Sequence, residues 1–375
     1  MKKQLVSRRD FIQGSSTAGL MLVGSALGAD PPAYGSPSPV AAEARAGQSS
    51  APGISGQGHM KFRVLRTSDS LPEAAQKVVI KAHGGFAVDR RPGKGETYFA
   101  LPGAGILQIS ADLKAIRLLK TAESMKKVNL HDTTIWNDPE DGAAYLAFPA
   151  NDAGKIFTTA LDGTLLSTLD APSPAQGFEQ PEVHDYFLGG GNFAPTGVTC
   201  LDGLYYITTG YCGLDFVLTS RISSPSHVVW NDLAFGGRGD EYNQFRTAHA
   251  VTVYPGAKQL AISDRKHSAI KRFTRYGHYL STLRMPMGCL PCSIDYLDGY
   301  AVVPTLEGPD PGKGAPIYIF QGDQLISAIF PKAELGLKNF QHNHKAVLTK
   351  VDSKFYIIVQ AWNPGDFAIL EQVTG

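Results

Sequence analysis

The stretch from Thr247 to Phe273 constrains the fold of this chain most, because it reads as a complete unit of short strands and tight turns. It opens with the run HAVTVY at His249, turns at Pro255-Gly256, continues as QLAISD and ends in AIKRF. Apolar residues alternate with polar ones in these runs, which is the period of half-buried strands. A sheet this small cannot bury both of its faces alone, so similar units must pack beside it.

Weaker copies of this unit recur from about residue 78 onward, and we count six units in all. Asp-Gly turns at matching places in two of them support the register. In the first unit we expect strands at Val78–Ile80, Thr97–Phe99 and Ile106–Ile109. The later units begin near the following residues: His131, Pro195, Thr247, Pro291 and His344.

The sixth unit has only three strands before the chain ends, and the run FRVL from Phe62 to Leu65 matches the missing outer strand. Its pairing would close a ring of sheets and remove the open edge. We therefore predict an all-β, six-bladed β-propeller over residues 60–375. The alternative is a seven-bladed ring, because residues 221–245 are long enough to contain further strands.

Composition agrees with this architecture and limits the partners. Forty glycines and twenty-four prolines indicate many turns, and the 43% apolar share is enough for a sizeable core. The net charge of +1 gives no reason to expect nucleic acid or an anionic membrane as a partner. No apolar run reaches the roughly 18 residues that a spanning helix needs. We expect a monomer that takes a small molecule or a peptide as its substrate.

The first residues have the pattern of an export signal. The run SRRDFI, with Arg8 and Arg9, precedes an apolar stretch from Ala18 to Leu27 and a small-residue exit. Paired arginines in this context resemble the twin-arginine signal of bacteria. We expect residues 1–29 to be a signal peptide read by the twin-arginine machinery, residues 30–59 to be a disordered linker, and the mature protein to be periplasmic or extracellular. The alternative is an uncleaved anchor at the lipid surface.

Four cysteines suit an oxidising compartment and allow three pairings. They are Cys200, Cys212, Cys289 and Cys292. The CLPC run that ends at Cys292 has no second pair, as a zinc ribbon would need, and no helical pattern after it, as a thioredoxin motif would have. A structural disulfide or two buried thiols are the readings that remain.

His131, His249 and His344 stand at the start of the first strand in units two, four and six. In a propeller that strand lines the central channel, and alternate blades of six lie about 120° apart. Three imidazoles would therefore converge on the axis. Three histidines with an open fourth position are typical of a catalytic zinc site. Taken singly, each histidine is more often an ordinary polar residue of the channel.

The other histidines do not share this position. We interpret five of them as surface or core residues: His83, His184, His227, His267 and His278. His342 lies two residues before His344, on the same side of a strand, and is a candidate for an extra group in the pocket.

The unit from His249 to Arg265 resembles the NHL-repeat propeller of the peptidyl-α-hydroxyglycine α-amidating lyases. The run GYC around Tyr211 resembles the blade that holds the catalytic tyrosine of that family, and His131 and His344 match its other two zinc histidines. The resemblance spans most of residues 120–370 and is most specific at 249–265 and 211–212.

This resemblance implies cleavage of a carbinolamide into a peptide amide and glyoxylate. Tyr211 would take the proton of the substrate hydroxyl, and Arg265 would bind a carboxylate through its two-nitrogen fork. A tyrosine titrates near pH 10, so zinc and the nearby guanidinium would be needed to favour phenolate. Zinc would also polarise the hydroxyl oxygen.

The sequence departs from the family at several positions. Thr209 replaces an aspartate beside the tyrosine, and Arg90 and Arg91 are only nearby candidates for a second catalytic arginine. Lys345 replaces the aspartate that binds a structural calcium, so we expect its ammonium in place of that ion. His342 replaces a pocket methionine, which predicts a more polar cavity.

Three functions compete at this point. The first is a zinc-dependent carbon–nitrogen lyase of the amidating type. The second is a non-catalytic exported propeller that binds a peptide or protein partner. The third is a calcium-dependent lactonase-type propeller, which would need acidic ligands in the channel that the strand starts do not offer.

Overall fold

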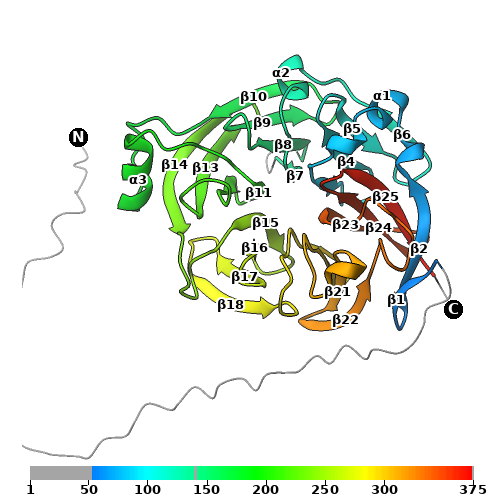
Figure 1. Ribbon diagram of the computed structural model, residues 1–375. Coiled ribbons are helices and arrows are strands. Elements are labelled where there is room, and N and C mark those ends of the chain that lie inside the picture. The colour runs from blue at the N-terminus through cyan, green and yellow to red at the C-terminus, as the bar shows by residue number, and fades with distance from the viewer. Residues whose placement is uncertain (1–52, 139–141, 374–375) are drawn as a thin grey trace, which may run out of the picture. The chain divides into compact units, whose positions relative to one another are not determined.

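The computed structural model describes residues 53–138 and 142–373, so the expected signal peptide and the linker up to residue 52 lie outside the described residues. Six antiparallel sheets stand around a common axis, each with its first strand innermost (Figure 1). The protein is an all-β, six-bladed β-propeller, as the repeat count predicted. In the described part of the chain, no helix is long and apolar enough to cross a membrane.

The first three blades are four-stranded meanders. Blade one comprises β3 (Phe86–Val88), β4 (Thr97–Leu101), β5 (Gly105–Ile109) and β6 (Ile116–Leu118). Blade two comprises β7 (Thr134–Asn137), β8 (Ala144–Ala150), β9 (Lys155–Ala160) and β10 (Leu165–Asp170). Blade three comprises β11 (Gly197–Leu201), β12 (Leu204–Thr208), β13 (Phe216–Ser224) and β14 (His227–Gly236).

The last three blades complete the ring. Blade four comprises β15 (Ala248–Tyr254), β16 (Gln259–Asp264), β17 (Ala269–Thr274) and β18 (Tyr279–Arg284). Blade five comprises β19 (Asp295–Leu297), β20 (Tyr300–Pro304), β21 (Ile317–Gln321) and β22 (Gln324–Ile329). Blade six comprises β23 (Asn343–Val351), β24 (Lys354–Ala361), β25 (Asp366–Gln372), β2 (Met60–Thr67) and β1 (Ser55–Gln57).

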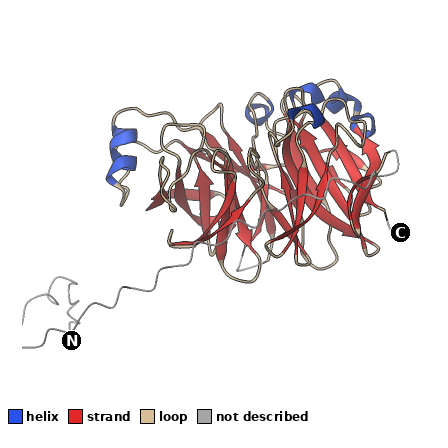
Figure 2. Ribbon diagram, turned by 60° about the horizontal axis from the view of Figure 1, so that its bottom comes forward, coloured by secondary structure: helices blue, strands red, loops and turns tan. Residues whose placement is uncertain are grey.

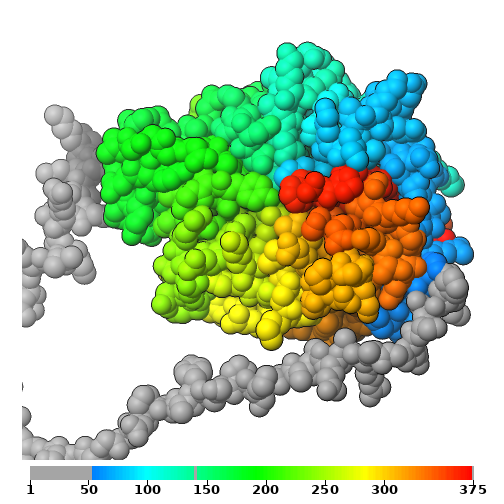
Figure 3. All heavy atoms as spheres, in the orientation of Figure 1, coloured from blue at the N-terminus to red at the C-terminus, as the bar shows by residue number. Residues whose placement is uncertain are grey.

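The ring is closed by strands from opposite ends of the chain. β2 pairs with β25 in antiparallel register, with Phe62 opposite Gln372, so the predicted outer strand is confirmed. In Figure 3 the blue residues from the start of the described chain lie beside the red residues from its end. β1 adds a fifth strand to this blade, and it lies inside the segment 30–59 that was expected to be a disordered linker. The ordered body therefore begins before residue 60.

The structure excludes the seven-bladed alternative and corrects one expected strand. The segment 221–245 contains no additional blade, because β14 pairs with β13 as the outer strand of blade three. The run Val78 to Ile80 is not a strand: Val79–Lys81 forms a 3-10 turn, and the innermost strand of blade one is β3. The apolar run suggested a strand, but Ile80 is 56% exposed and the run has no partner strand to pair with.

The short helices lie on one side of the ring, as Figure 2 shows. They occupy connections that lead from an outer strand to the next inner strand, or from a second strand to a third. These elements are η1 (Ser68–Ser70), α1 (Glu73–Gln76), η2 (Val79–Lys81), α2 (Glu123–Lys126), α3 (Pro181–Leu188) and η3 (Pro311–Lys313). On this face the inner strands begin and the second strands end.

Apolar side chains fill the spaces between neighbouring blades. One cluster joins Met60 and Phe62 of blade six to Ile317 and Ile329 of blade five, and all four side chains are fully buried. Each sheet thus buries both faces against its neighbours, which a single blade cannot do alone.

Candidate metal centre

Six residues at the starts of the inner strands form a ring around the axis, one from each blade. In order they are Gly84, His131, Thr196, His249, Cys292 and His344. His249 and His344 lie within β15 and β23, whereas His131 precedes β7 by three residues. The predicted placement in blades two, four and six is therefore observed, with His131 just outside its strand.

Each of the three histidines is oriented by the backbone of the next blade. His131 Nδ1 lies 2.6 Å from Thr196 O, His249 Nδ1 lies 2.6 Å from Cys292 O, and His344 Nδ1 lies 2.9 Å from Gly84 O. A carbonyl oxygen can only accept a hydrogen bond, so Nδ1 carries the proton in all three rings. The lone pair of each neutral imidazole is then on Nε2.

The three rings are neutral as well as oriented. Each residue is 1% exposed, and burial lowers the pKa of all three well below the ordinary histidine value. Neighbouring positive groups, Arg265 among them, act in the same direction. Neutral imidazole is the form that binds metal ions.

The nitrogens of two of these rings face each other without a proton between them. His131 Nε2 and His344 Nε2 are 3.2 Å apart, although both are acceptors when Nδ1 is protonated. The ring centroids of the three histidines lie 4.6, 4.9 and 5.1 Å apart. Two buried lone pairs at this distance repel each other, and a cation between them would remove the repulsion. The residues present therefore fit a metal ion.

Tyr211 and Arg265 lie beside the histidines, and each follows the end of the second strand of its blade. Tyr211 follows β12 and Arg265 follows β16, so both lie on the face where the inner strands begin. Tyr211 Oη is 3.2 Å from His249 Nε2, and Arg265 Nη1 donates to Tyr211 Oη at 2.9 Å. Because His249 Nε2 is an acceptor, the Tyr211 hydroxyl is its donor.

Burial raises the pKa of Tyr211, and the charge and hydrogen bond of Arg265 oppose this effect without overcoming it. Tyr211 is thus a neutral phenol in the metal-free protein. The expectation that Arg265 favours phenolate is correct in direction, but the guanidinium alone is insufficient. Tyr211 remains 37% exposed, so this side of the cluster reaches solvent.

The turn that carries Tyr211 is held by residues on both sides of it. Thr209 Oγ1 donates to Phe216 O at 2.7 Å and accepts from Phe216 N at 3.0 Å. At Gly210 a Cβ would lie 2.4 Å from Ala248 O, so the close approach of blades three and four requires glycine there. Asp215 accepts from Ala248 N at 2.9 Å and so connects the turn to the strand that carries His249.

Arg265 is a buried cation without a carboxylate partner. It is 6% exposed, and its Nη2 donates to the Cys292 thiol at 3.1 Å. Its Nε is buried and has no hydrogen-bond partner, and no salt bridge to it occurs among the described residues. A guanidinium in this state has donors left for an anionic ligand.

A buried ion pair separates the histidines from the rest of the channel. Lys345 Nζ lies 2.7 Å from Asp132 Oδ1, and both side chains are less than a tenth exposed. Burial raises the pKa of Asp132, while Lys345 acts in the opposite direction. Lys345 thus lines the axial channel, one residue beyond the histidine level.

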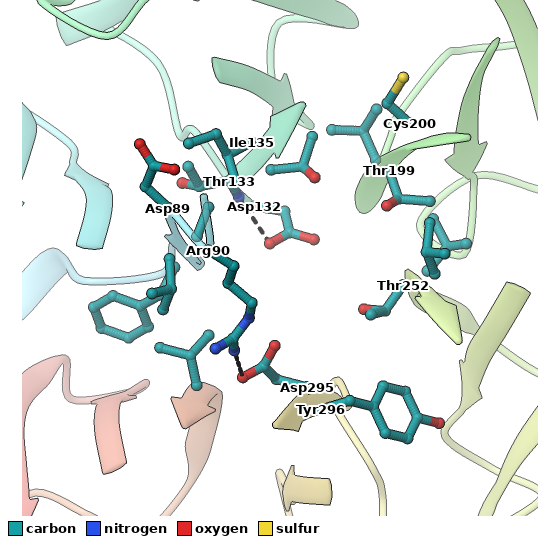
Figure 4. Close-up of a pocket in the computed structure, with 18 of the residues that line it drawn as sticks. Asp89, Arg90, Asp132, Thr133, Ile135, Thr199, Cys200, Thr252, Asp295 and Tyr296 are labelled. Carbon is teal, nitrogen blue, oxygen red and sulfur yellow. Dashed lines mark hydrogen bonds and ion pairs between the residues drawn. The ribbon is translucent and has the colours of Figure 1, made fainter. Parts of the chain in front are cut away.

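On the other side of this pair the channel widens into a pocket of about 500 Å³ (Figure 4). Its lining comes from residues further along the inner strands, including Thr199, Thr252 and Asp295. Arg90 pairs with Asp295 at 2.7 Å in this pocket.

Arg90 and Arg91, the candidates for a second catalytic arginine, are therefore on the wrong side of the channel. Arg91 pairs with Asp89 at 2.7 Å and lines the pocket of Figure 4. Both arginines follow the end of β3, whereas the histidine level lies at the strand starts. At about 3.3 Å per residue, that places them well away from the histidines.

His83 was expected to be a surface or core residue, and the structure places it in the cluster instead. One ring nitrogen from each of His83, His131 and His344 lies within 4.8 Å of the others. This nitrogen group differs from the expected tripod, because it contains His83 in place of His249. His249 Nε2 instead lies 3.2 Å from Tyr211 Oη. His83 was missed because blade one was assigned to the wrong inner strand; with β3 as that strand, His83 directly precedes the ring residue Gly84.

The remaining candidates have simpler roles. All four cysteines are free thiols, and Cys289 and Cys292 are fully buried, so the reading as two buried thiols is the one observed. His342 is half-buried, with Nδ1 2.7 Å from Leu306 O and its ring 6.2 Å from Trp362. It lies beside the cluster but outside the nitrogen group.

No family model matches the sequence. Solved structures with a similar fold include a streptogramin B lyase, which is 14% identical, with 76% of this chain and 92% of that chain covered and a TM-score of 0.44. A catalytically inactive virginiamycin B lyase from Staphylococcus aureus with quinupristin is 13% identical, with 78% and 96% covered and a TM-score of 0.45. A chain of a nidogen/laminin complex is 11% identical, with 78% and 96% covered and a TM-score of 0.49.

Proposed function

We propose that this protein is an exported, zinc-dependent carbon–nitrogen lyase that cleaves a carbinolamide of the α-hydroxyglycine type. The observation that supports it most is the pair of Nε2 atoms of His131 and His344, which face each other at 3.2 Å. Both are buried and unprotonated. A cation bound by both nitrogens would remove the repulsion between their lone pairs, and three histidines with an open position suit catalytic zinc.

His131, His249 and His344 would hold the ion through Nε2. When bound, a zinc ion would polarise the hydroxyl oxygen of the substrate and favour the phenolate of Tyr211. Once His249 Nε2 is a ligand, Tyr211 Oη loses that acceptor and keeps the hydrogen bond from Arg265. Its oxygen is then available to the substrate.

Tyr211 would move one proton during the cleavage. The phenolate oxygen takes the hydroxyl proton of the carbinolamide, the electrons of that O–H bond form the aldehyde C=O, and the C–N bond breaks. Tyr211 Oη then returns the proton to the amide nitrogen. The products are an amide and glyoxylate, and no further reactant is needed.

Arg265 would bind the carboxylate of the substrate. Its guanidinium is buried beside Tyr211, has an unpartnered Nε, and carries no salt bridge among the described residues. A planar fork of donors matches the two oxygens of a carboxylate. A substrate held there would place its hydroxyl near Tyr211 Oη.

We further propose that the Lys345 ammonium takes the place of the structural calcium of the amidating lyases. Its salt bridge to Asp132 at 2.7 Å places a positive charge in the axial channel. A calcium ion bound at this pair in the purified protein would contradict this substitution.

The proposal is tested first by metal content and then by turnover. We expect about one zinc per chain after gentle purification, and loss of that zinc in His249→Ala but not in His278→Ala, a histidine on the outer part of blade four. Elemental analysis measures both. A wild-type protein without zinc would refute the metal site.

Turnover of an α-hydroxyglycine peptide then tests the lyase. We expect Tyr211→Phe to keep its zinc and lose at least about 100-fold in kcat, because general acid–base catalysis typically contributes that much. Zinc-loaded wild-type protein without activity on this substrate would leave the alternative, a metal-containing propeller that binds a peptide or protein partner.

A further inference from the structure

We propose that His83 supplies a fourth protein nitrogen to the metal centre and that Asn129 orients it. The inference rests on the proposed metal site and concerns which residues of this chain make it. With four protein nitrogens bound, the substrate hydroxyl would take a fifth position, an expansion that catalytic zinc sites allow. His83 comes from blade one, between two blades that carry the expected ligands. Its ring centroid lies 4.6 Å from that of His131 and 4.4 Å from that of His344.

These distances are shorter than those of an expected ligand. The His249 centroid lies 4.9 Å from that of His131 and 5.1 Å from that of His344. His83 also belongs to the group whose ring nitrogens all lie within 4.8 Å of one another. The backbone determines this placement, because the residue after His83 is Gly84, whose carbonyl accepts from His344 Nδ1.

The Nε2 atom of His83 makes no hydrogen bond that would prevent it from binding a metal ion. Its Nε2 is buried and has no hydrogen-bond partner, which is rare for a buried polar atom. Its Nδ1 lies 3.0 Å from Asn129 Nδ2, and Asn129 Oδ1 is also buried without a partner. The contact between His83 and Asn129 thus leaves one unsatisfied polar atom on each of the two residues.

Turning the amides of Asn129 and Asn151 together would give Asn129 Oδ1 its donors and leave His83 Nε2 as an acceptor for the ion. If the Asn129 amide turns by 180°, Oδ1 accepts from His83 Nδ1–H, and the Nε2 lone pair is released toward the cluster. The Asn151 amide, whose Oδ1 now accepts from Asn129 at 2.9 Å, turns with it and becomes a donor. His83 would then match the other histidines, with Nδ1–H on an oxygen and Nε2 toward the ion.

The ring of His83 is held from the other side by Trp362. The two rings are stacked, with centroids 5.1 Å apart and planes at 27°. A phenylalanine at position 83 keeps this stacking and removes only the nitrogens. His83→Phe is therefore the variant that tests the nitrogen, and His342→Phe is its matched control, because His342 also lies beside Trp362 but outside the nitrogen group.

The experiment uses the full chain and Zn²⁺ or Co²⁺ alone, without substrate. X-ray absorption of the wild-type complex should give four imidazoles, and His83→Phe should give three and bind at least about 100-fold more weakly. Asn129→Leu should keep four imidazoles and bind about 10- to 100-fold more weakly, as is typical for outer hydrogen-bond partners. His342→Phe should match the wild type in both measurements.

The outcomes separate this inference from the proposed function. Three imidazoles in the wild type, or unchanged binding in His83→Phe, would overturn the role of His83 and leave the three-histidine site intact. A wild-type protein that binds neither ion would overturn both. If His83→Phe does not fold, the wild-type imidazole count and the Asn129→Leu affinity decide the question alone.

Discussion

At the scale of single residues, the site is defined by where protons can reside. Three Nδ1 atoms face carbonyl oxygens, so the protonation of each ring follows from backbone geometry and not from solvent. The same reasoning directs the Tyr211 hydroxyl toward His249. Residues that are ambiguous in isolation thus acquire definite donor and acceptor roles from their neighbours.

Arg265 allows a sharp test at this scale, conditional on the proposed carboxylate substrate. Arg265→Lys keeps the charge but loses the fork that contacts both Tyr211 and the Cys292 thiol. We expect KM to rise at least about 10-fold, since a charged hydrogen bond contributes about 1.5–3 kcal/mol, while the zinc content stays the same. Steady-state kinetics and elemental analysis measure these quantities; an unchanged KM would exclude Arg265 as the carboxylate-binding residue.

At the scale of elements, the ring depends on one strand pairing between distant parts of the chain. Glu371 on β25 lies 2.6 Å from Arg63 on β2 and 2.9 Å from Lys354 on β24. Burial would raise the pKa of Glu371, but the hydrogen bonds from Lys354 and Arg63 outweigh it and lower this pKa below its ordinary value. The carboxylate therefore stabilises the closing blade in its charged form.

The lowered pKa of Glu371 predicts how the stability of the closing blade depends on pH. A lowered carboxyl pKa stabilises the fold above the unfolded pKa, about 4.3, and this contribution is lost as the pH falls through the folded value. We expect Glu371→Gln to lower the free energy of unfolding by about 1–2 kcal/mol at pH 7, because Arg63 is largely exposed and its share is screened. The difference from the wild type should shrink as the pH falls below about 4.3 and vanish once the pH is below the lowered pKa of Glu371.

Urea unfolding at several pH values measures this difference. Glu123→Gln is the control, because Glu123 also pairs with a lysine but is 73% exposed at the side chain, and we expect no measurable change in stability from it. A deficit in Glu371→Gln that does not shrink as the pH is lowered through the acid range would show that the charge of Glu371 is not its cause.

At the scale of the whole molecule, the channel is divided by a pair that joins blades two and six. Asp132 and Lys345 lie on opposite sides of blade one and meet at 2.7 Å. They separate the histidine face from the pocket of Figure 4, which is lined by inner strands of the ring. The two ends of the propeller channel are therefore lined by different kinds of side chain.

Removing one partner of this buried ion pair should destabilise the protein more than removing both partners. Lys345→Met leaves the Asp132 carboxylate buried without its cation, and we expect a loss of about 3–5 kcal/mol in the free energy of unfolding. Asp132→Asn combined with Lys345→Met should recover most of that loss, since no buried charge remains. Denaturant unfolding of the three proteins tests this, and a double variant no more stable than Lys345→Met would contradict it.

The blade count, the ring closure by residues 62–65 and the alternate-blade histidines were all predictable from the sequence. They follow from patterns with a local period, namely the two-residue alternation of strands and the recurrence of one unit. The same approach failed at Val78–Ile80, where an apolar run is a 3-10 turn, and that error hid His83. A short apolar run does not show by itself whether a partner strand exists.

Local pattern thus determined the ring and the convergence of His131, His249 and His344 on its axis. Only the tertiary structure decided which nitrogen of each ring faces the axis, that His83 joins them, and that Arg90 and Arg91 lie at the other mouth. Those features depend on contacts such as that between His344 and Gly84, which are 260 positions apart. Such contacts arise when blades pack together, and no local period in the chain encodes them.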